Sequence, residues 1–124
     1  MWIALLLHVG VTAAIESSRW STVAIGGGGY VTGLVQSAAT GAAYARTDVG
    51  GAWRLPTSVG SNGSWTQLLK SFPPRLRNFY AVESIAVEGT ALYLAVGDGF
   101  RLPSAILRSE DGGATWVNRS YWNL

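Results

Sequence analysis

Two stretches of the chain place acidic residues in nearly the same setting. Residues 44–53 read YARTDVGGAW, and residues 106–116 read ILRSEDGGATW. With the glycines aligned, the first copy has a valine opposite Asp111 and carries its own acid one position earlier, at Asp48. A carboxylate can brace a turn or transfer a proton, and a shift of one position turns a side chain to the other face of an extended segment. We therefore expect Asp111 to be structural and Asp48 to be available for chemistry.

The second copy resembles the Asp box found in sialidase-like and related propellers, whose pattern is Ser-x-Asp-x-Gly-x-Thr-Trp. The matching residues are Ser109, Asp111, Gly113, Thr115 and Trp116. An aspartate in a hairpin turn accepts hydrogen bonds from backbone N–H groups, and glycine adopts backbone angles that other residues avoid. Tryptophan supplies a large apolar plate that packs against neighbouring strands. These five residues are predicted to hold the hairpin.

In the first copy this box is incomplete. Thr47 takes the place of Ser109, and the threonine of the box is absent. On spacing alone, Asp48 is either an ordinary solvated turn residue or a free catalytic carboxylate. Arg46 lies two positions earlier and shares a face with Asp48 along an extended strand, where its charge could help to keep Asp48 ionised.

Composition excludes several other kinds of site. The chain has no cysteine and a single histidine, His8, which argues against a thiolate or histidine metal site and against a Ser-His-Asp triad. The glycines at 26–29 lack the Lys-Ser/Thr of a phosphate-binding loop. The nine basic residues are scattered and the net charge is only +2, so neither nucleic acid nor a membrane is an expected partner. No metal and no cofactor are expected.

The first residues predict a targeting segment. Residues 2–14, WIALLLHVGVTAA, are apolar and end in small residues. The run is shorter than the roughly 20 residues that span a bilayer as a helix. We therefore expect a secretory signal peptide over 1–14 and a secreted protein that begins near Ile15, although no lysine or arginine precedes the run. A buried first strand and a fragment boundary are the alternatives.

The rest of the chain reads as short strands. Sixteen glycines bound most of the runs, and no window has a sustained helical period. The expected strands are STVAIGG, YVTGLVQ, AAYARTD, AWRLP and SWTQLL, then, after the connector KSFPPRLRNFY, ESIAVEG, ALYLAVGDG, AILRSEDGG and ATWVNRS. The fold class is therefore predicted to be all-β.

The same series of runs occurs twice, which is typical of propeller blades. We expect a first blade over 15–70, a connector over 71–78 and a second blade over 79–124. A ring typically needs about four to eight blades, so two blades form an incomplete ring and predict an N-terminal fragment of a longer protein. A self-contained small β-sandwich is the alternative.

Longer matches suggest a family. The stretches VAIGGGGYVTGLV, YARTDVGGAWRL and VESIAVEGTALYLAVG, with the second copy above, resemble the opening of glycoside hydrolase family 74, the xyloglucanases. The resemblance covers residues 20–117 and implies the first two blades of a seven-bladed propeller, with a second propeller across a substrate cleft. It departs from the family pattern in QSAATGAA, at Trp53 and in VGDGFRLPSA.

The resemblance also implies an activity, which is hydrolysis of the β-1,4-glucan backbone of xyloglucan with inversion. Asp48 corresponds to the catalytic base, and Tyr30 and Arg46 are candidates for binding the polysaccharide. The resemblance implies that the general acid lies in the second propeller, and five other carboxylates of this chain do not match its motif. These carboxylates are Glu83, Glu88, Asp98, Glu110 and Asp111. We therefore expect this chain to be inactive by itself.

Two functions without catalysis compete with this interpretation. One is a binding propeller of the sortilin type, which shares Asp boxes and holds peptides, and the other is a propeller that serves as an assembly factor. A binding propeller does not require an acid displaced from its box position, so Asp48 favours the hydrolase over it.

Overall fold

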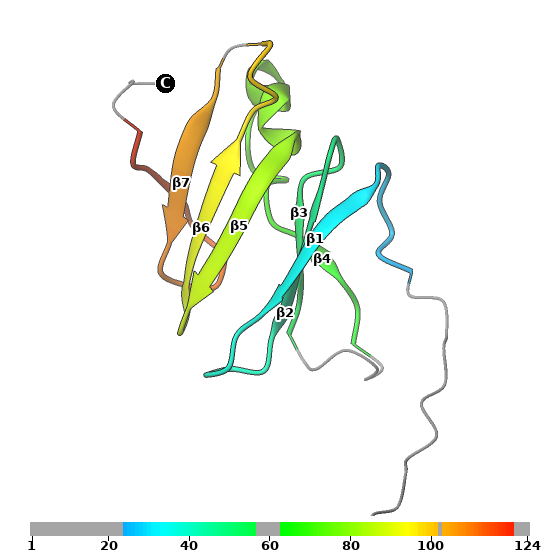
Figure 1. Ribbon diagram of the computed structural model, residues 1–124, viewed down its shortest axis with the longest axis vertical. Helices are drawn as coiled ribbons and strands as arrows, with labels where there is room; N and C mark the ends of the chain where they lie inside the picture. The colour runs from blue at the N-terminus through cyan, green and yellow to red at the C-terminus, as the bar shows by residue number, and fades with distance from the viewer. Residues whose placement is uncertain (1–23, 57–62, 102, 121–124) are drawn as a thin grey trace, which may run out of the picture.

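The computed structural model describes residues 24–56, 63–101 and 103–120, which form two four-stranded antiparallel sheets (Figure 1). The first sheet contains β1 (Val31–Gln36), β2 (Ala43–Thr47), β3 (Ala52–Leu55) and β4 (Thr66–Gln67). The second contains β5 (Val82–Glu88), β6 (Ala91–Val96), β7 (Ala105–Ser109) and β8 (Val117–Asn118). In each sheet every strand pairs with the next one along the chain. The all-β prediction is confirmed.

Buried and more exposed side chains alternate along the strands, and this alternation shows which face of a sheet is buried. In β6, Leu92, Leu94 and Val96 are buried, whereas the residues between them are only half-buried. Successive side chains of a strand point to opposite faces, so these three residues form one apolar row. Tyr44 of β2, which is 1% exposed, belongs to the same core as this row. The two sheets therefore bury their facing sides in one common core.

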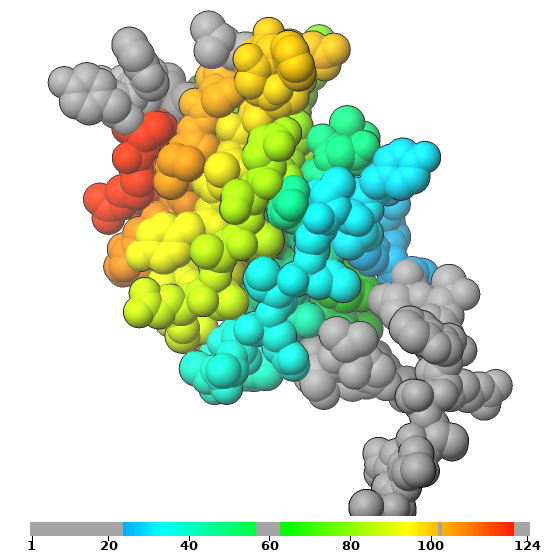
Figure 2. Space-filling model, viewed as in Figure 1, coloured from blue at the N-terminus to red at the C-terminus, as the bar shows by residue number. Residues whose placement is uncertain are grey.

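Polar contacts cross the seam between the sheets, where β1 and β5 lie side by side (Figure 2). The Ser37 hydroxyl donates to the carbonyl of Gly89 at 2.8 Å. Away from that seam, the indole of Trp116, which directly precedes β8, donates to the carbonyl of Leu68 at 3.2 Å. Because these bonds satisfy polar groups that packing removes from water, they add to the apolar contact between the sheets.

The connector between the sheets contains a 3₁₀ helix, η1 (Pro74–Tyr80), which the sequence did not predict. Its buried side chains, Leu76 and Phe79, are three residues apart. The element is kinked at Leu76, whose backbone angles are not helical, so it consists of two short pieces. Pieces this short leave no sustained helical period to detect in the sequence. Figure 1 shows η1 at the same end of the molecule as the β6–β7 connection.

The predicted strand around Val23 and Ile25 is not present in its described part, because Ala24 and Ile25 are irregular. The remainder of that segment and the predicted signal peptide over 1–14 lie outside the described residues. Within the part of the chain that the structure describes, no helix has the length and apolar character needed to cross a bilayer.

Candidate active site

Asp48 follows β2 directly, in the turn toward β3, and is exposed. Its Oδ1 accepts a hydrogen bond from the backbone N–H of Tyr30 at 2.8 Å. In return, the Asp48 N–H donates to the carbonyl of Tyr30 at 3.2 Å. Among the described residues, Oδ2 has no hydrogen-bond partner. The carboxylate is therefore held by a residue eighteen positions earlier and not by its own turn.

The glycine run at 26–29 makes this contact possible. Gly29 has a φ of +89°, and a Cβ atom there would lie 2.5 Å from Oδ1 of Asp48. The segment also packs closely against the turn, since a Cβ on Gly50 would collide with the carbonyl oxygen of Gly28. The glycines thus serve a close approach of two backbones, which only residues without a side chain permit.

Thr47 closes the turn of the first copy. Its hydroxyl accepts from the N–H of Gly50 at 2.8 Å and donates to the carbonyl of Gly51 at 2.9 Å. The indole of Trp53 donates to the carbonyl of Gly50 at 3.1 Å. Because Thr47 is 2% exposed, water does not compete for these bonds. The turn therefore closes without the help of Asp48.

In the second copy the acid belongs to the turn. Ser109 Oγ accepts from the N–H of Gly113 at 2.8 Å and donates to Oδ1 of Asp111 at 2.7 Å. The two oxygens of Asp111 accept from the N–H and the hydroxyl of Thr115, at 2.8 and 2.6 Å. These bonds, the hydroxyl's foremost, hold the pKa of Asp111 well below its usual range. Both oxygens are thus engaged within the hairpin.

Glu110 stands where the first copy has Asp48, yet it is engaged differently. Its carboxylate forms an ion pair with Arg108, whose Nε also donates to the hydroxyl of Tyr93 at 3.0 Å. The corresponding arginine of the first copy, Arg46, does not pair with Asp48 in the described part of the chain. Among the described residues, Asp48 therefore differs from Asp111 in having one oxygen without a partner, and from Glu110 in forming no ion pair.

Arg46 instead spans the seam between the sheets. Its Nη1 donates to the hydroxyl of Thr32 at 2.9 Å and to the carbonyl of Val82 at 3.1 Å. Gly33 pairs with Arg46 across β1 and β2, and a Cβ there would lie 2.6 Å from the Arg46 Nε. The sequence suggested that the charge of Arg46 supports Asp48 directly. The guanidinium instead passes over β1 to Val82, because Gly33 has no side chain to block it.

Asp48 lines a groove of about 580 Å³ together with η1 and the β6–β7 connection. Its polar and charged lining residues are Asp48, Arg75, Arg77, Asn78, Tyr80, Asp98 and Arg101. Tyr30, whose backbone holds Asp48, is 80% exposed. The structure therefore joins the two predicted site residues Tyr30 and Asp48 by a hydrogen bond. Asp48 lines a groove that also contains arginines the sequence interpretation did not single out.

Asp98 is the second carboxylate of this groove. Its Oδ1 accepts from the N–H groups of Arg101 and Phe100 at 2.9 and 3.0 Å. These bonds, that from Arg101 foremost, lower the pKa of Asp98. A general acid must keep its proton until the leaving oxygen takes it, which requires a raised pKa. Asp98 is therefore unsuited to that role.

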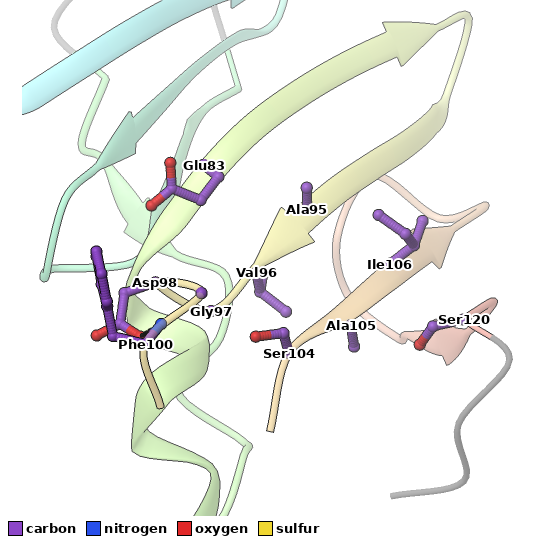
Figure 3. A pocket seen from close by; sticks show the side chains of 11 residues that line it. Glu83, Ala95, Val96, Gly97, Asp98, Phe100, Ser104, Ala105, Ile106 and Ser120 are labelled. Carbon is purple, nitrogen blue, oxygen red and sulfur yellow. Dashed lines mark hydrogen bonds between the residues drawn. The ribbon is translucent and has the colours of Figure 1, made fainter. Parts of the chain in front are cut away.

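A larger hollow of about 640 Å³ lies over the ends of β6 and β7 (Figure 3). Ala95 and Ile106 line it, and Glu83, Asp98 and Phe100 stand toward one side. Its two acids are Glu83 in β5 and Asp98 in the β6–β7 connection, and no bond joins them among the described residues. It offers a mainly apolar surface, so the groove at Asp48 remains the candidate active site. No group of three or more potential metal ligands occurs within the described ranges.

No protein-family model matches the chain. It is 39% identical over 107 residues to a xyloglucanase of Acetivibrio thermocellus, a match that covers 79% of this chain and 12% of the relative. It is 39% identical to the crystal structure of a GH74 xyloglucanase from Xanthomonas campestris, with a TM-score of 0.63 over 81% of this chain and 15% of that one.

A GH74 enzyme from Niastella koreensis is 36% identical, with a TM-score of 0.65 over 77% of this chain and 14% of that one. The chain spans 11% to 14% of the length of the curated relatives it matches. The predicted propeller fold and the predicted resemblance are confirmed, and the two sheets are blades of a ring that is incomplete within this chain. Over these two blades, the chain belongs to glycoside hydrolase family 74.

Proposed function

We propose that Asp48 is the general base of an enzyme that hydrolyses the β-1,4-glucan backbone of xyloglucan. The observation that carries this proposal is that the two oxygens of the Asp48 carboxylate are engaged differently. Oδ1 is fixed by the N–H of Tyr30, while Oδ2 has no partner among the described residues. A binding propeller has no need of such a carboxylate in the lining of a groove. The names of the relatives, which are xyloglucanases, supply the substrate class.

The proposed reaction is inverting. One carboxylic acid protonates the leaving oxygen, while a carboxylate takes a proton from the water that attacks the opposite face of the sugar, and the two groups stand roughly 6.5–9.5 Å apart. Asp48 takes the proton on Oδ2 and is kept in one orientation by the bond to Oδ1. The acid lies in another part of the protein, since Asp98, the other carboxylate of the groove, is engaged and its pKa is lowered. The chain by itself is then inactive.

Substrate contacts are proposed for two of the residues that the sequence singled out. Tyr30 is exposed and its backbone binds Asp48, and the flat apolar face of its ring suits stacking on a sugar ring. Arg46 uses Nη1 for its two contacts, which leaves Nη2 for a sugar hydroxyl. A polymeric substrate does not cross a membrane, so we also propose that the protein is secreted under the direction of residues 1–14.

The test is Asp48→Asn in the full-length enzyme, assayed by release of reducing sugar from xyloglucan. Removing a general base typically lowers the rate by about 100- to 10,000-fold, and we expect kcat to fall within that range. Glu110→Gln is the matched control, because Glu110 is the aligned acid of the second copy and is bound by Arg108. It should retain most of the activity. Near-normal turnover by a folded Asp48→Asn variant would remove the assignment.

A further inference from the structure

The groove at Asp48 contains more arginines than carboxylates. Arg75 and Arg77 extend from η1, and Arg101 extends from the β6–β7 connection. All three are exposed, and the acids that face them in the groove are Asp48 and Asp98. Two different elements therefore bring positive charge to the place where the proposed base stands.

The pairing within the groove leaves the surplus charge on η1. Nη1 of Arg101 lies 3.8 Å from Oδ2 of Asp98, so these two groups offset each other. The side chains of Arg75 and Arg77 make no hydrogen bond or ion pair within the described part of the chain. Two guanidinium groups thus face the groove without a carboxylate of their own.

The backbone under these arginines is well anchored. The side chain of Asn78 donates to the carbonyls of Arg101 and Pro103, at 2.6 and 3.1 Å, and so ties the β6–β7 connection to η1. Phe79 is fully buried and contacts the ring of Phe72 edge-on, with centroids 5.3 Å apart. The elements that carry the three arginines are therefore fixed relative to each other, which favours a ligand that contacts more than one of them.

A neutral glucan presents only hydroxyl groups and does not require unpaired cations. A guanidinium group is planar and matches a carboxylate with two parallel N–H···O bonds, which gives both strength and geometric selectivity. Resting on the function proposed above, we propose that the groove binds a hexuronic acid unit of the glycan, with Arg75 and Arg77 as the ligands of its carboxylate. The enzyme then prefers a xyloglucan whose branches carry uronic acid.

The experiment compares kcat/KM of the full-length enzyme on two xyloglucan oligosaccharides that differ only in carrying a galacturonate or a galactose branch. We expect the acidic substrate to be preferred, and the double variant Arg75→Gln, Arg77→Gln to lower the acidic-to-neutral ratio by about tenfold, because charge-assisted bonds are lost. Arg119→Gln, an exposed arginine outside the groove, is the matched control and should leave the ratio unchanged. Raising the ionic strength should weaken the preference.

Competition by oligogalacturonate distinguishes the source of the acid. If oligogalacturonate inhibits the wild type but not the double variant, the groove also binds a separate acidic glycan. If the acidic substrate is preferred but oligogalacturonate does not inhibit, the uronate must be a branch of the substrate. Equal kcat/KM for both oligosaccharides, unchanged in the double variant, would overturn the inference and leave the proposed function intact. If neither oligosaccharide is hydrolysed, the proposed function fails. Calorimetry then measures the affinity of the protein for each oligosaccharide, and equal affinities would overturn the inference.

Discussion

Asp111 uses both of its carboxylate oxygens inside its own hairpin, whereas Asp48 uses one oxygen to hold a distant backbone. The difference follows from what the first turn no longer needs. The hydroxyl of Thr47 already satisfies Gly50 and Gly51, and Val49, at the position of Asp111, is exposed. Because the turn closes without a carboxylate, the neighbouring acid is free to take another role.

The role of Asp111 is testable through the pH dependence of stability. A carboxyl whose pKa is lowered by folding stabilises the protein above its unfolded pKa, about 3.9, and loses that contribution progressively as the pH falls below it. We expect Asp111→Ala to lower the urea midpoint at pH 7, because Thr115 loses its acceptors. The difference in urea midpoint between wild type and variant should shrink as the pH falls below about 4, because the carboxyl of the unfolded chain is protonated in that range.

Urea titrations at pH 7 and at several acidic pH values measure this difference. Glu110→Ala is the matched control, since its exposed ion pair with Arg108 is of a kind that contributes little to stability. A constant gap between wild type and Asp111→Ala at every pH would show that the ionised form is not what holds the hairpin.

Some residue-level features could be predicted from the sequence and others could not. Alignment of the glycines shows that Asp48 stands one position before the acid of the Asp box. The sequence alone therefore predicts that Asp48 does not hold its own turn. The partner of Oδ1 is Tyr30, and the partners of Arg46 include Val82 in the other sheet. Contacts between segments this far apart depend on how β1 packs, which no local pattern contains.

At the level of elements, strands bounded by glycine were predictable because alternation and turn residues act locally. The runs YVTGLVQ and ALYLAVGDG contain β1 and β6, with ends within a few residues. The helix η1 was not predictable in this way. Its identity depends on burial of Leu76 and Phe79 between the sheets, and tertiary packing decides such short elements more than local propensity does.

The crossing of Arg46 over β1 makes a prediction about pairs of residues. Gly33→Ala should displace the guanidinium from Thr32 and Val82 and cost about 1 kcal/mol of unfolding free energy, the net value of a typical hydrogen bond. In an Arg46→Ala background the same substitution should cost close to nothing, because the atoms that it displaces, from Cγ outward, are absent. Urea unfolding of the four proteins of this cycle gives the coupling free energy. Equal costs in both backgrounds would mean that Gly33 is required for another reason.

At the scale of the molecule, the two sheets share one core and leave their outer faces in contact with solvent. Leu34 on the first sheet is 62% exposed and Ile106 on the second is 44% exposed. A propeller blade covers such faces with its neighbours, so these side chains are placed as the blade architecture requires. The common core, built from Tyr44, Phe79 and the row along β6, implies that neither sheet is stable without the other.

This mutual dependence can be measured by hydrogen exchange. Leu94 is fully buried in β6, and Leu94→Ala should lower the unfolding free energy by about 2–5 kcal/mol. Because the core is common, the slowly exchanging amides of β2 should lose as much protection as those of β6. Leu34→Ala, on an exposed face, is the matched control and should change stability by no more than about 0.5 kcal/mol. Loss of protection confined to β5–β8 would mean that each sheet unfolds separately, and the two blades would then not form one cooperative unit.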